Sequence, residues 1–168
     1  MLDSKLLQLL RVLDQEDLRW MAKFVRSPFY NNQQEVIALF DYIRKFHPAC
    51  HSPYLKKELV FEKIRPQTKY NDRRMRVLMF RLSSLVEEFL VAQKLRKDEV
   101  QHQKLMVEAL GERDLFELFE KKNKALLQRL DNEPYRDETY FEQRWQLMRN
   151  WLYHPELDRL SIQQTDLQ

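Results

Sequence analysis

Apolar residues recur along this chain at spacings of three and four positions, the pattern typical of amphipathic α-helices. Six prolines cut the pattern into stretches of helical length, because proline cannot continue a helix and moves the residue before it out of the α conformation. No stretch alternates with a period of two, so a sheet of any size is not expected. The pattern therefore predicts an all-α fold. Its helices are expected at about residues 4–13, 14–27, 33–46, 55–64, 72–92, 100–110, 113–130 and 137–153.

The longest of these helices has two faces that both carry apolar residues. Asn71 is its expected cap, as Asp14 is for the second helix. The face expected to be buried repeats at alternating steps of three and four: Met75, Leu78, Leu82, Leu85, Phe89 and Ala92. The opposite face, found by stepping 100° per residue, carries Arg73, Val77, Phe80 and Ser84, with Arg74 and Arg81 on one flank and Arg76 on the other. Such a helix either lies between two layers or offers a contact surface.

Two joints between predicted helices share an aromatic residue followed by asparagine. In the first joint, Asn32 and Glu35 have the spacing of a capping box, and Phe29 and Tyr30 are placed to fill the corner between two helices. The same motif recurs at residues 69–72. A structural role is therefore favoured over a binding loop.

Composition narrows the possible classes of function. Hydrophobic residues make up 43% of the 168 residues and charged residues 33%, the balance of a folded protein. Gly111, the one glycine, is expected to break a helix, and the chain has neither a P-loop nor a dinucleotide-binding fingerprint. Cys50 is the one cysteine, so no disulfide can form within the chain. Because the N-terminus lacks the build of a signal peptide and no apolar run has membrane-spanning length, we expect a cytoplasmic protein with no membrane partner.

Two short motifs contain residue types that bind metals. His47, Cys50 and His51 lie within five positions, but a structural zinc site needs four ligands and there is no second cysteine. Glu99 and His102 have the spacing of one half of a di-iron site, and the other half is missing. We therefore expect no metal, no other cofactor and no catalysis.

Charge is unevenly distributed, although the net charge is only +3. Residues 56–81 hold nine Lys or Arg against three Asp or Glu, whereas residues 82–168 hold thirteen against seventeen. In one interpretation, the helices on either side of residues 65–71 form a helix-turn-helix that binds nucleic acid.

In the other interpretation, the arginines are the solvated edge of a helical array, and Phe80 packs under a neighbouring helix or a partner. If a helical layer covers Phe80, its replacement by alanine would cost about 3 kcal/mol or more. The second interpretation is favoured, because the turn at residues 65–71 is longer than the usual three or four residues of a helix-turn-helix.

Four features follow one another in the first 92 residues: Lys23-Phe24-Val25 leading into Ser27-Pro28-Phe29-Tyr30-Asn31, then Lys57-Glu58-Leu59-Val60-Phe61, then Tyr70-Asn71-Asp72, and then Arg76, Leu78, Leu82, Leu85, Val86, Glu88, Phe89 and Leu90. Their order and spacing resemble an uncharacterised family of helical proteins from the Bacteroidota, and the likeness extends more loosely through Tyr153-His154-Pro155. The resemblance implies a helical fold that longer members continue with helix pairs similar to tetratricopeptide-type solenoids. It implies that this chain is an N-terminal fragment or a short member, and it carries over no activity.

The sequence thus predicts a helical bundle over residues 1–95 and antiparallel helical hairpins over residues 96–168. The favoured function is a non-catalytic scaffold or protein-interaction module with an unidentified protein partner. The expected contacts are Arg73, Arg74, Arg76, Val77, Phe80 and Arg81, with Trp145 and Trp151 as further outward-facing residues. The alternative is a nucleic-acid-binding regulator that uses residues 56–81. The third and weakest hypothesis is a helical enzyme whose site needs further C-terminal residues. The oligomeric state is left open.

Overall fold

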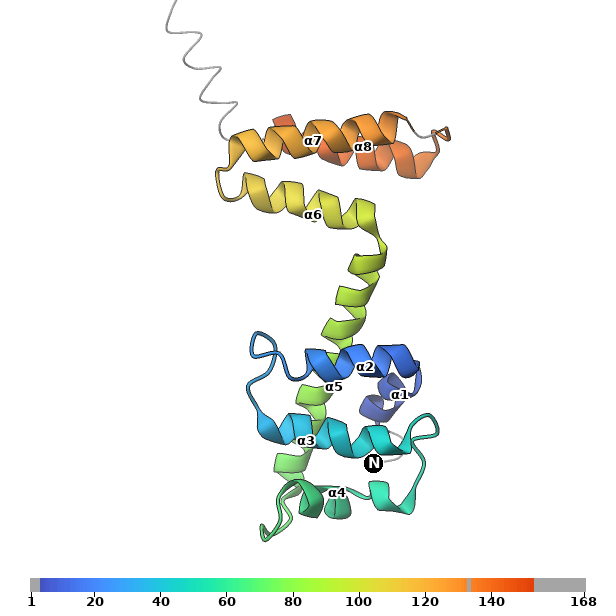
Figure 1. The fold of residues 1–168 in the computed structure, drawn as a ribbon, viewed down its shortest axis with the longest axis vertical. Helices are drawn as coiled ribbons and strands as arrows, with labels where there is room; N and C mark the ends of the chain where they lie inside the picture. The colour runs from blue at the N-terminus through green and yellow to red at the C-terminus, as the bar shows by residue number, and fades with distance from the viewer. Residues whose placement is uncertain (1–3, 133, 153–168) are drawn as a thin grey trace, which may run out of the picture. The chain divides into compact units, whose positions relative to one another are not determined.

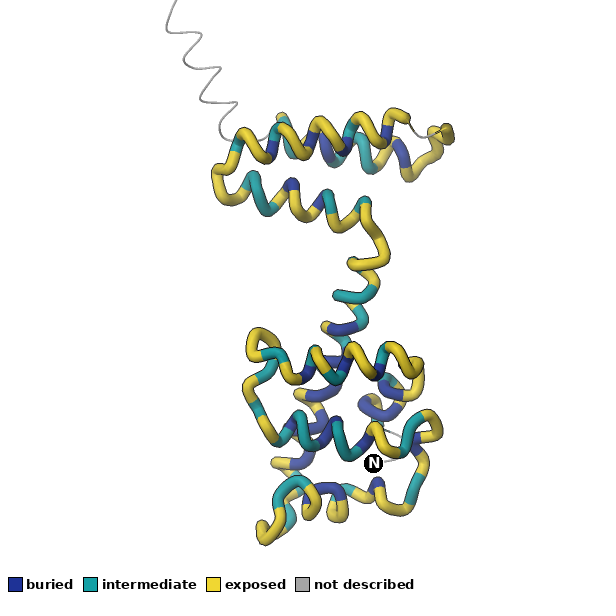
Figure 2. Tube along the Cα trace, viewed as in Figure 1, coloured by how far each residue is buried: buried dark blue, intermediate teal, exposed yellow. Residues whose placement is uncertain are grey.

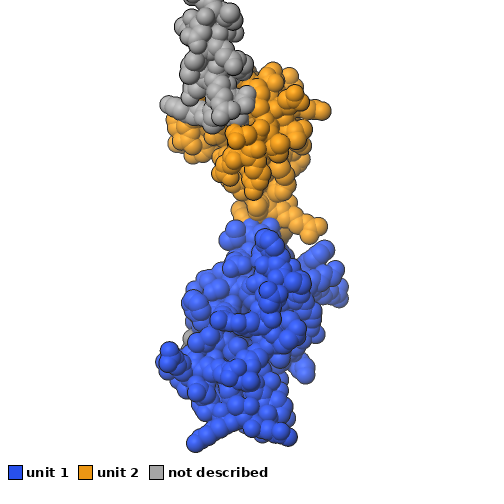
Figure 3. Space-filling model, turned by 90° about the vertical axis from the view of Figure 1, so that its left-hand side faces the viewer, with its two compact units in different colours: residues 1–93 blue, residues 94–168 orange. Residues whose placement is uncertain are grey.

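Every regular element in the computed structural model, which describes residues 4–132 and 134–152, is a helix (Figure 1). The predicted all-α class is therefore confirmed. The chain divides into two compact units, residues 1–93 (unit 1) and residues 94–168 (unit 2), which Figure 3 colours separately. The division falls within the longest helix, α5 (Asp72–Lys97), close to the boundary after residue 95 that the sequence predicts.

Unit 1 packs short helices around the first two thirds of α5. The described elements before α5 are α1 (Lys5–Arg11), α2 (Gln15–Phe24), α3 (Gln34–Ile43), the 3-10 turns η1 (Arg44–Phe46) and η2 (Pro53–Leu55), and α4 (Lys57–Ile64). One continuous apolar core joins them, and each helix contributes residues with almost no exposed surface, such as Leu7, Met21, Phe40, Phe61 and Leu82. Figure 2 shows these buried stretches turned toward the interior of the unit. Burying each such side chain contributes about 1.5–3 kcal/mol.

Side-chain caps fix where two helices of unit 1 begin. The Asp14 carboxylate accepts a hydrogen bond from the Asp17 N–H at 2.7 Å, and the Asp17 carboxylate accepts one from the Asp14 N–H at 3.3 Å. This reciprocal capping box starts α2. The Asn71 side-chain oxygen accepts from the N–H of Arg74 at 2.9 Å and caps α5. Both predicted caps are confirmed.

The joint between α2 and α3 is held by Asn31 instead of the predicted pair Asn32 and Glu35. The Asn31 side-chain amide donates to the Val25 carbonyl at 2.9 Å, and the Asn31 side-chain oxygen accepts from the Gln33 N–H at 3.1 Å. Gln33 takes the N-cap position of α3 without a side-chain cap bond. The predicted capping box is therefore wrong, because Asn31 reaches back to the end of α2 and sets the turn.

Of the two aromatic residues at this joint, Tyr30 fills the corner and Phe29 does not. The Tyr30 ring stacks on Phe24 with a centroid distance of 4.0 Å. Phe29 meets the Tyr30 ring edge-on at 5.0 Å and is 88% exposed. The predicted packing role is wrong for Phe29, because Tyr30 already occupies the space over Phe24.

In its described residues, unit 2 comprises the end of α5 and the helices α6 (Glu99–Gly111), α7 (Phe116–Asp131) and α8 (Glu138–Leu152). α6 and α7 run in opposite directions, and α8 returns alongside α7 (Figure 1). Gly111 ends α6 but does not make the turn that follows; Asp114 takes the left-handed conformation there, with a φ of 55°. The antiparallel hairpins expected from the sequence are present, and a tetratricopeptide-type solenoid stays a prediction.

The two tryptophans of α8 lie on different sides of the helix. Trp145 is 60% exposed, as predicted. Trp151 is half-buried, with its ring centroid 6.0 Å from that of Phe119 and 6.3 Å from that of Phe116. The outward orientation predicted for Trp151 is wrong, because six residues separate the two positions by about 120° around a helix.

Candidate functional site

The predicted contact residues lie together on the outward side of α5, within unit 1. We call them the α5 face: Arg73, Arg74, Arg76, Val77, Phe80 and Arg81, all exposed. The opposite side of the same helix buries Met75, Leu78 and Leu82 in the core of unit 1. The face is thus fixed by helix geometry, because anchoring one side in the core turns the other side outward.

Two apolar side chains form the centre of the α5 face. Val77 is 44% exposed and Phe80 is 70% exposed. Within the described residues, no second helical layer covers Phe80, so the expectation that a neighbouring helix of the chain buries it is wrong. Aromatic residues, phenylalanine among them, are enriched in the cores of protein interfaces relative to the rest of the surface.

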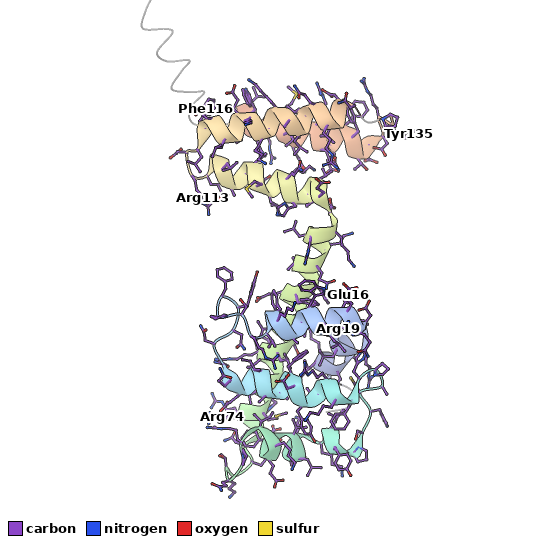
Figure 4. The ribbon with its side chains drawn as sticks, in the orientation of Figure 1. Glu16, Arg19, Arg74, Arg113, Phe116 and Tyr135 are labelled. Carbon is purple, nitrogen blue, oxygen red and sulfur yellow. The ribbon has the colours of Figure 1, made fainter. Side chains whose placement is uncertain are left out.

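Glu35 of α3 neutralises one edge of the face. Its Oε1 atom lies 2.8 Å from Nε of Arg65 and 3.1 Å from Nη2 of Arg74. Arg74, labelled in Figure 4, lies beside the N-terminal part of α3. One carboxylate therefore holds two guanidinium groups from the turn and from α5, and Arg74 is engaged with its own chain.

Asp72, at the start of α5, neutralises a second edge. Its carboxylate lies 2.9 Å from Nε of Arg76 and 3.2 Å from Nζ of Lys57, and it accepts a hydrogen bond from the Tyr70 hydroxyl at 3.0 Å. The hydrogen bonds from Tyr70 and Lys57 lower the pKa of Asp72, so the carboxylate is held in its charged form. Burial, followed by the bond to Asp72, raises the pKa of Tyr70 to about 12.

Arg73 and Arg81 differ from the other two arginines of the face. Within residues 4–132 and 134–152, neither has a carboxylate within ion-pair distance. They lie on either side of Val77 along the helix and are exposed. The face therefore presents an apolar centre between two arginines that are available to a partner.

Three shallow, open hollows surround Val77 and Phe80, with volumes of about 260, 470 and 400 Å³. The largest is lined by Arg73, Arg76, Val77 and Phe80. Small-molecule sites are usually concave pockets that bury most of the ligand. An open surface with a protruding aromatic ring is better suited to an extended partner than to a small molecule.

The two helices that the helix-turn-helix interpretation requires are present on either side of residues 65–71, but they do not pack as that motif would. α4 and α5 are separated by the turn at residues 65–71, in which Gln67 has a φ of 65°, and α4 packs against α3. Glu35 and Asp72 place negative charge on the surface that would meet phosphate groups. Nucleic-acid binding through this surface stays a prediction that these carboxylates disfavour.

The candidate metal ligands lie in different environments. Cys50 is fully buried, and burial raises the pKa of its thiol. His51 is exposed, whereas both ring nitrogens of His47 are buried without a hydrogen-bond partner among the described residues. Glu99 pairs with Arg129 at 3.0 Å, which lowers the pKa of Glu99. Over residues 4–132 and 134–152, no three His, Cys, Asp or Glu side chains are grouped so as to hold a metal ion.

Two buried polar residues of unit 2, Lys104 and Asn123, were not predicted from the sequence. Lys104 of α6 is almost fully buried and donates to Oε1 of Gln146 at 3.0 Å, and burial lowers its pKa. Asn123 of α7 is fully buried and donates to the Leu147 carbonyl at 3.3 Å. Their burial could have been predicted from their spacing, because each occupies a position of its helix that continues the apolar repeat.

An exposed apolar row on α8 was also not predicted from the sequence, apart from its member Trp145. The residues of this row repeat at helical spacing, which is a signal visible in the sequence.

None of the helices in the described part of the chain is both long and apolar enough to cross a membrane.

The fold and the site define an all-α protein of two helical units, one of which carries an apolar face flanked by arginines. No protein-family model, no curated protein and no solved structure matches the chain. The resemblance to the Bacteroidota family stays a prediction. Function must therefore be argued from the surface itself.

Proposed function

We propose that this chain is a non-catalytic protein-interaction module whose α5 face binds an acidic, amphipathic segment of a partner protein. The observation that carries the proposal is the 70% exposed Phe80 ring, which shares a hollow with Val77 and Arg73, while Arg81 lines a second hollow that Val77 also borders. The single buried cysteine, Cys50, requires no oxidising compartment, so we place this activity in the cytoplasm.

The chemistry of the face specifies the partner. An apolar side chain of the partner covers Phe80 and Val77 and removes them from water. Carboxylates on either side of that residue form paired hydrogen bonds with Arg73 and Arg81, a geometry in which guanidinium groups are particularly effective. The opposite charge raises the association rate and selects against basic partners.

Nucleic acid is the second candidate, supported by the nine Lys or Arg among residues 56–81. Its phosphates would contact Arg73 and Arg81, but they would also approach Glu35 and Asp72. It leaves the exposed Phe80 without a role unless a base stacks on the ring. We therefore rank it below the acidic segment.

The experiment is a selection from a library of displayed random peptides, using the full chain as bait. We expect enrichment of peptides with one or two apolar residues flanked by Asp or Glu at helical spacing. Two bait variants, Phe80→Ser and the double variant Arg73→Glu with Arg81→Glu, should lose this enrichment. The matched control is Lys121→Glu, a charge reversal at an exposed position of α7.

The proposal fails if wild-type and Phe80→Ser baits enrich the same peptides, or if the enriched peptides are basic. Enrichment of apolar peptides without acidic residues would also contradict it, because the arginines would then have no part in recognition. Far-UV circular dichroism of each bait must match that of the wild type, so that lost enrichment is not lost folding.

A further inference from the structure

Four large apolar residues form an exposed row along α8. They are Phe141 (58% exposed), Trp145 (60%), Met148 (45%) and Leu152 (64%). Successive members are four, three and four positions apart, so they lie on one side of the helix. We call this row the α8 stripe.

The other two sides of α8 are already occupied within unit 2. Tyr140 and Leu147 are buried in the core that α8 shares with α7. On the side toward α6, Gln146 accepts a hydrogen bond from Lys104 at 3.0 Å, and Asn150 donates one to Glu108 at 3.4 Å. Among the described residues, none of the four belongs to the buried core of unit 2, although the Phe141 ring meets Tyr140 edge-on at 5.1 Å. A row this exposed calls for a covering surface.

Charge along the edge of the stripe identifies what covers it. Glu142 and Arg149 lie on the same edge, seven positions apart, and neither is within ion-pair distance of an opposite charge in the described part of the chain. Burial lowers the pKa of Lys104 of α6, and the charge of Glu142 still reaches that group and raises its pKa against this effect. The Arg149 guanidinium lies 4.9 Å from the centroid of the Trp145 ring and so extends over the stripe. In an antiparallel pair of identical helices, like edges meet, and a contact of one residue with another is repeated by symmetry.

We propose that two copies of this chain associate through their α8 stripes, with the helices antiparallel. Glu142 of each copy then meets Arg149 of the other, which gives two identical ion pairs. The two-fold axis passes beside Trp145, and Phe141 of each copy lies against Met148 and Leu152 of the other. A parallel arrangement would not bring these two charged residues together.

The interface is small, because a helix of 15 residues is about 22 Å long. Stable interfaces bury about 1,200–2,000 Å², so a single helix pair gives a weak dimer with a dissociation constant on the order of 10–100 μM. The protein is then a monomer when dilute and a dimer when concentrated.

The experiment is sedimentation equilibrium of the full chain at concentrations from about 5 to 500 μM. The average mass should rise from 20.8 kDa toward twice that value. Trp145→Ser, Glu142→Arg and Arg149→Glu should each raise the dissociation constant at least about tenfold. Lys121→Glu, on exposed α7 surface, is the control and should leave the constant unchanged.

Mixing two variants separates the proposed contact from a folding defect. The Glu142→Arg chain carries two arginines on this edge and the Arg149→Glu chain two glutamates, so neither pairs with itself. An equimolar mixture should dimerise at least as well as the wild type, because both contacts are then attractive. A misfolded variant would not recover in this way.

A wild-type chain that stays monomeric up to the highest concentration overturns the proposal, whether a different protein or the residues after Leu152 cover the stripe. A dimer that Trp145→Ser leaves unchanged also overturns it. So does a mixture of the two charge variants that remains monomeric while each variant keeps the helical content of the wild type.

Discussion

Truncating Phe80 to alanine should cost little stability, whereas truncating Phe40 should cost much. A fully covered phenylalanine side chain buries about 150–250 Å². Phe80 is 70% exposed, so only about 60 Å² of this area leaves water on folding. At about 25 cal/mol per Å² this corresponds to about 1.5 kcal/mol, and alanine retains part of it. We expect Phe80→Ala to lower the free energy of unfolding by about 1 kcal/mol or less.

Phe40→Ala is the matched comparison, because the Phe40 side chain is fully buried in the core of unit 1. Its truncation leaves a cavity and should cost about 3–5 kcal/mol. Urea unfolding followed by circular dichroism measures both values, with the slope checked for a change in the extent of unfolding. A cost of about 3 kcal/mol or more for Phe80→Ala would refute the reasoning, because the ring would then be covered in the folded chain.

Three further predictions concern stability. Asp14→Ala removes the capping box with Asp17 and should lower the free energy of unfolding by about 1 kcal/mol; an unchanged melting temperature would contradict this. His47→Phe should raise the free energy of unfolding by about 1 kcal/mol, since both ring nitrogens are buried without partners in the described residues; a destabilised variant would show that the nitrogens are satisfied. Because burial and Asp72 raise the pKa of Tyr70 from 10.0 to about 12, the unfolded chain ionises first, and the stability from Tyr70 is present below pH 10 and lost as pH rises toward 12. Tyr70→Phe should remove the tyrosine ionisation near pH 12 from an alkaline absorbance titration. It should also flatten the loss of stability over this range.

The helices and the two sides of α5 could be predicted from the sequence because they depend on local geometry. A step of 100° per residue decides that Met75 and Phe80 point in different directions, and the structure buries the first and exposes the second. The caps at Asp14 and Asn71 are equally local, since each side chain bonds a backbone N–H three positions on.

Other features depend on contacts between distant segments and could not be predicted. Asn31 and Asn32 have the same chemistry, and the carbonyl of Val25 decides which of them holds the joint. The pair between Glu35 and Arg74 joins residues 39 positions apart, and it decides which arginines of the α5 face remain available. The sequence shows the arginines of the face but not this pair, which is why nucleic acid is an alternative on sequence grounds.

The most direct test of the proposed function measures peptide and DNA binding by the same protein. A labelled acidic peptide from the selection and a labelled DNA duplex are titrated with the full chain at several salt concentrations. We predict saturable peptide binding that Phe80→Ser weakens at least about tenfold, with only weak, sequence-independent DNA binding. The contradicting result is saturable DNA binding that Phe80→Ser leaves unchanged. In that case, replacing Arg73 and Arg81 with alanine should flatten the slope of log K against log salt by about one unit for each phosphate that is no longer neutralised.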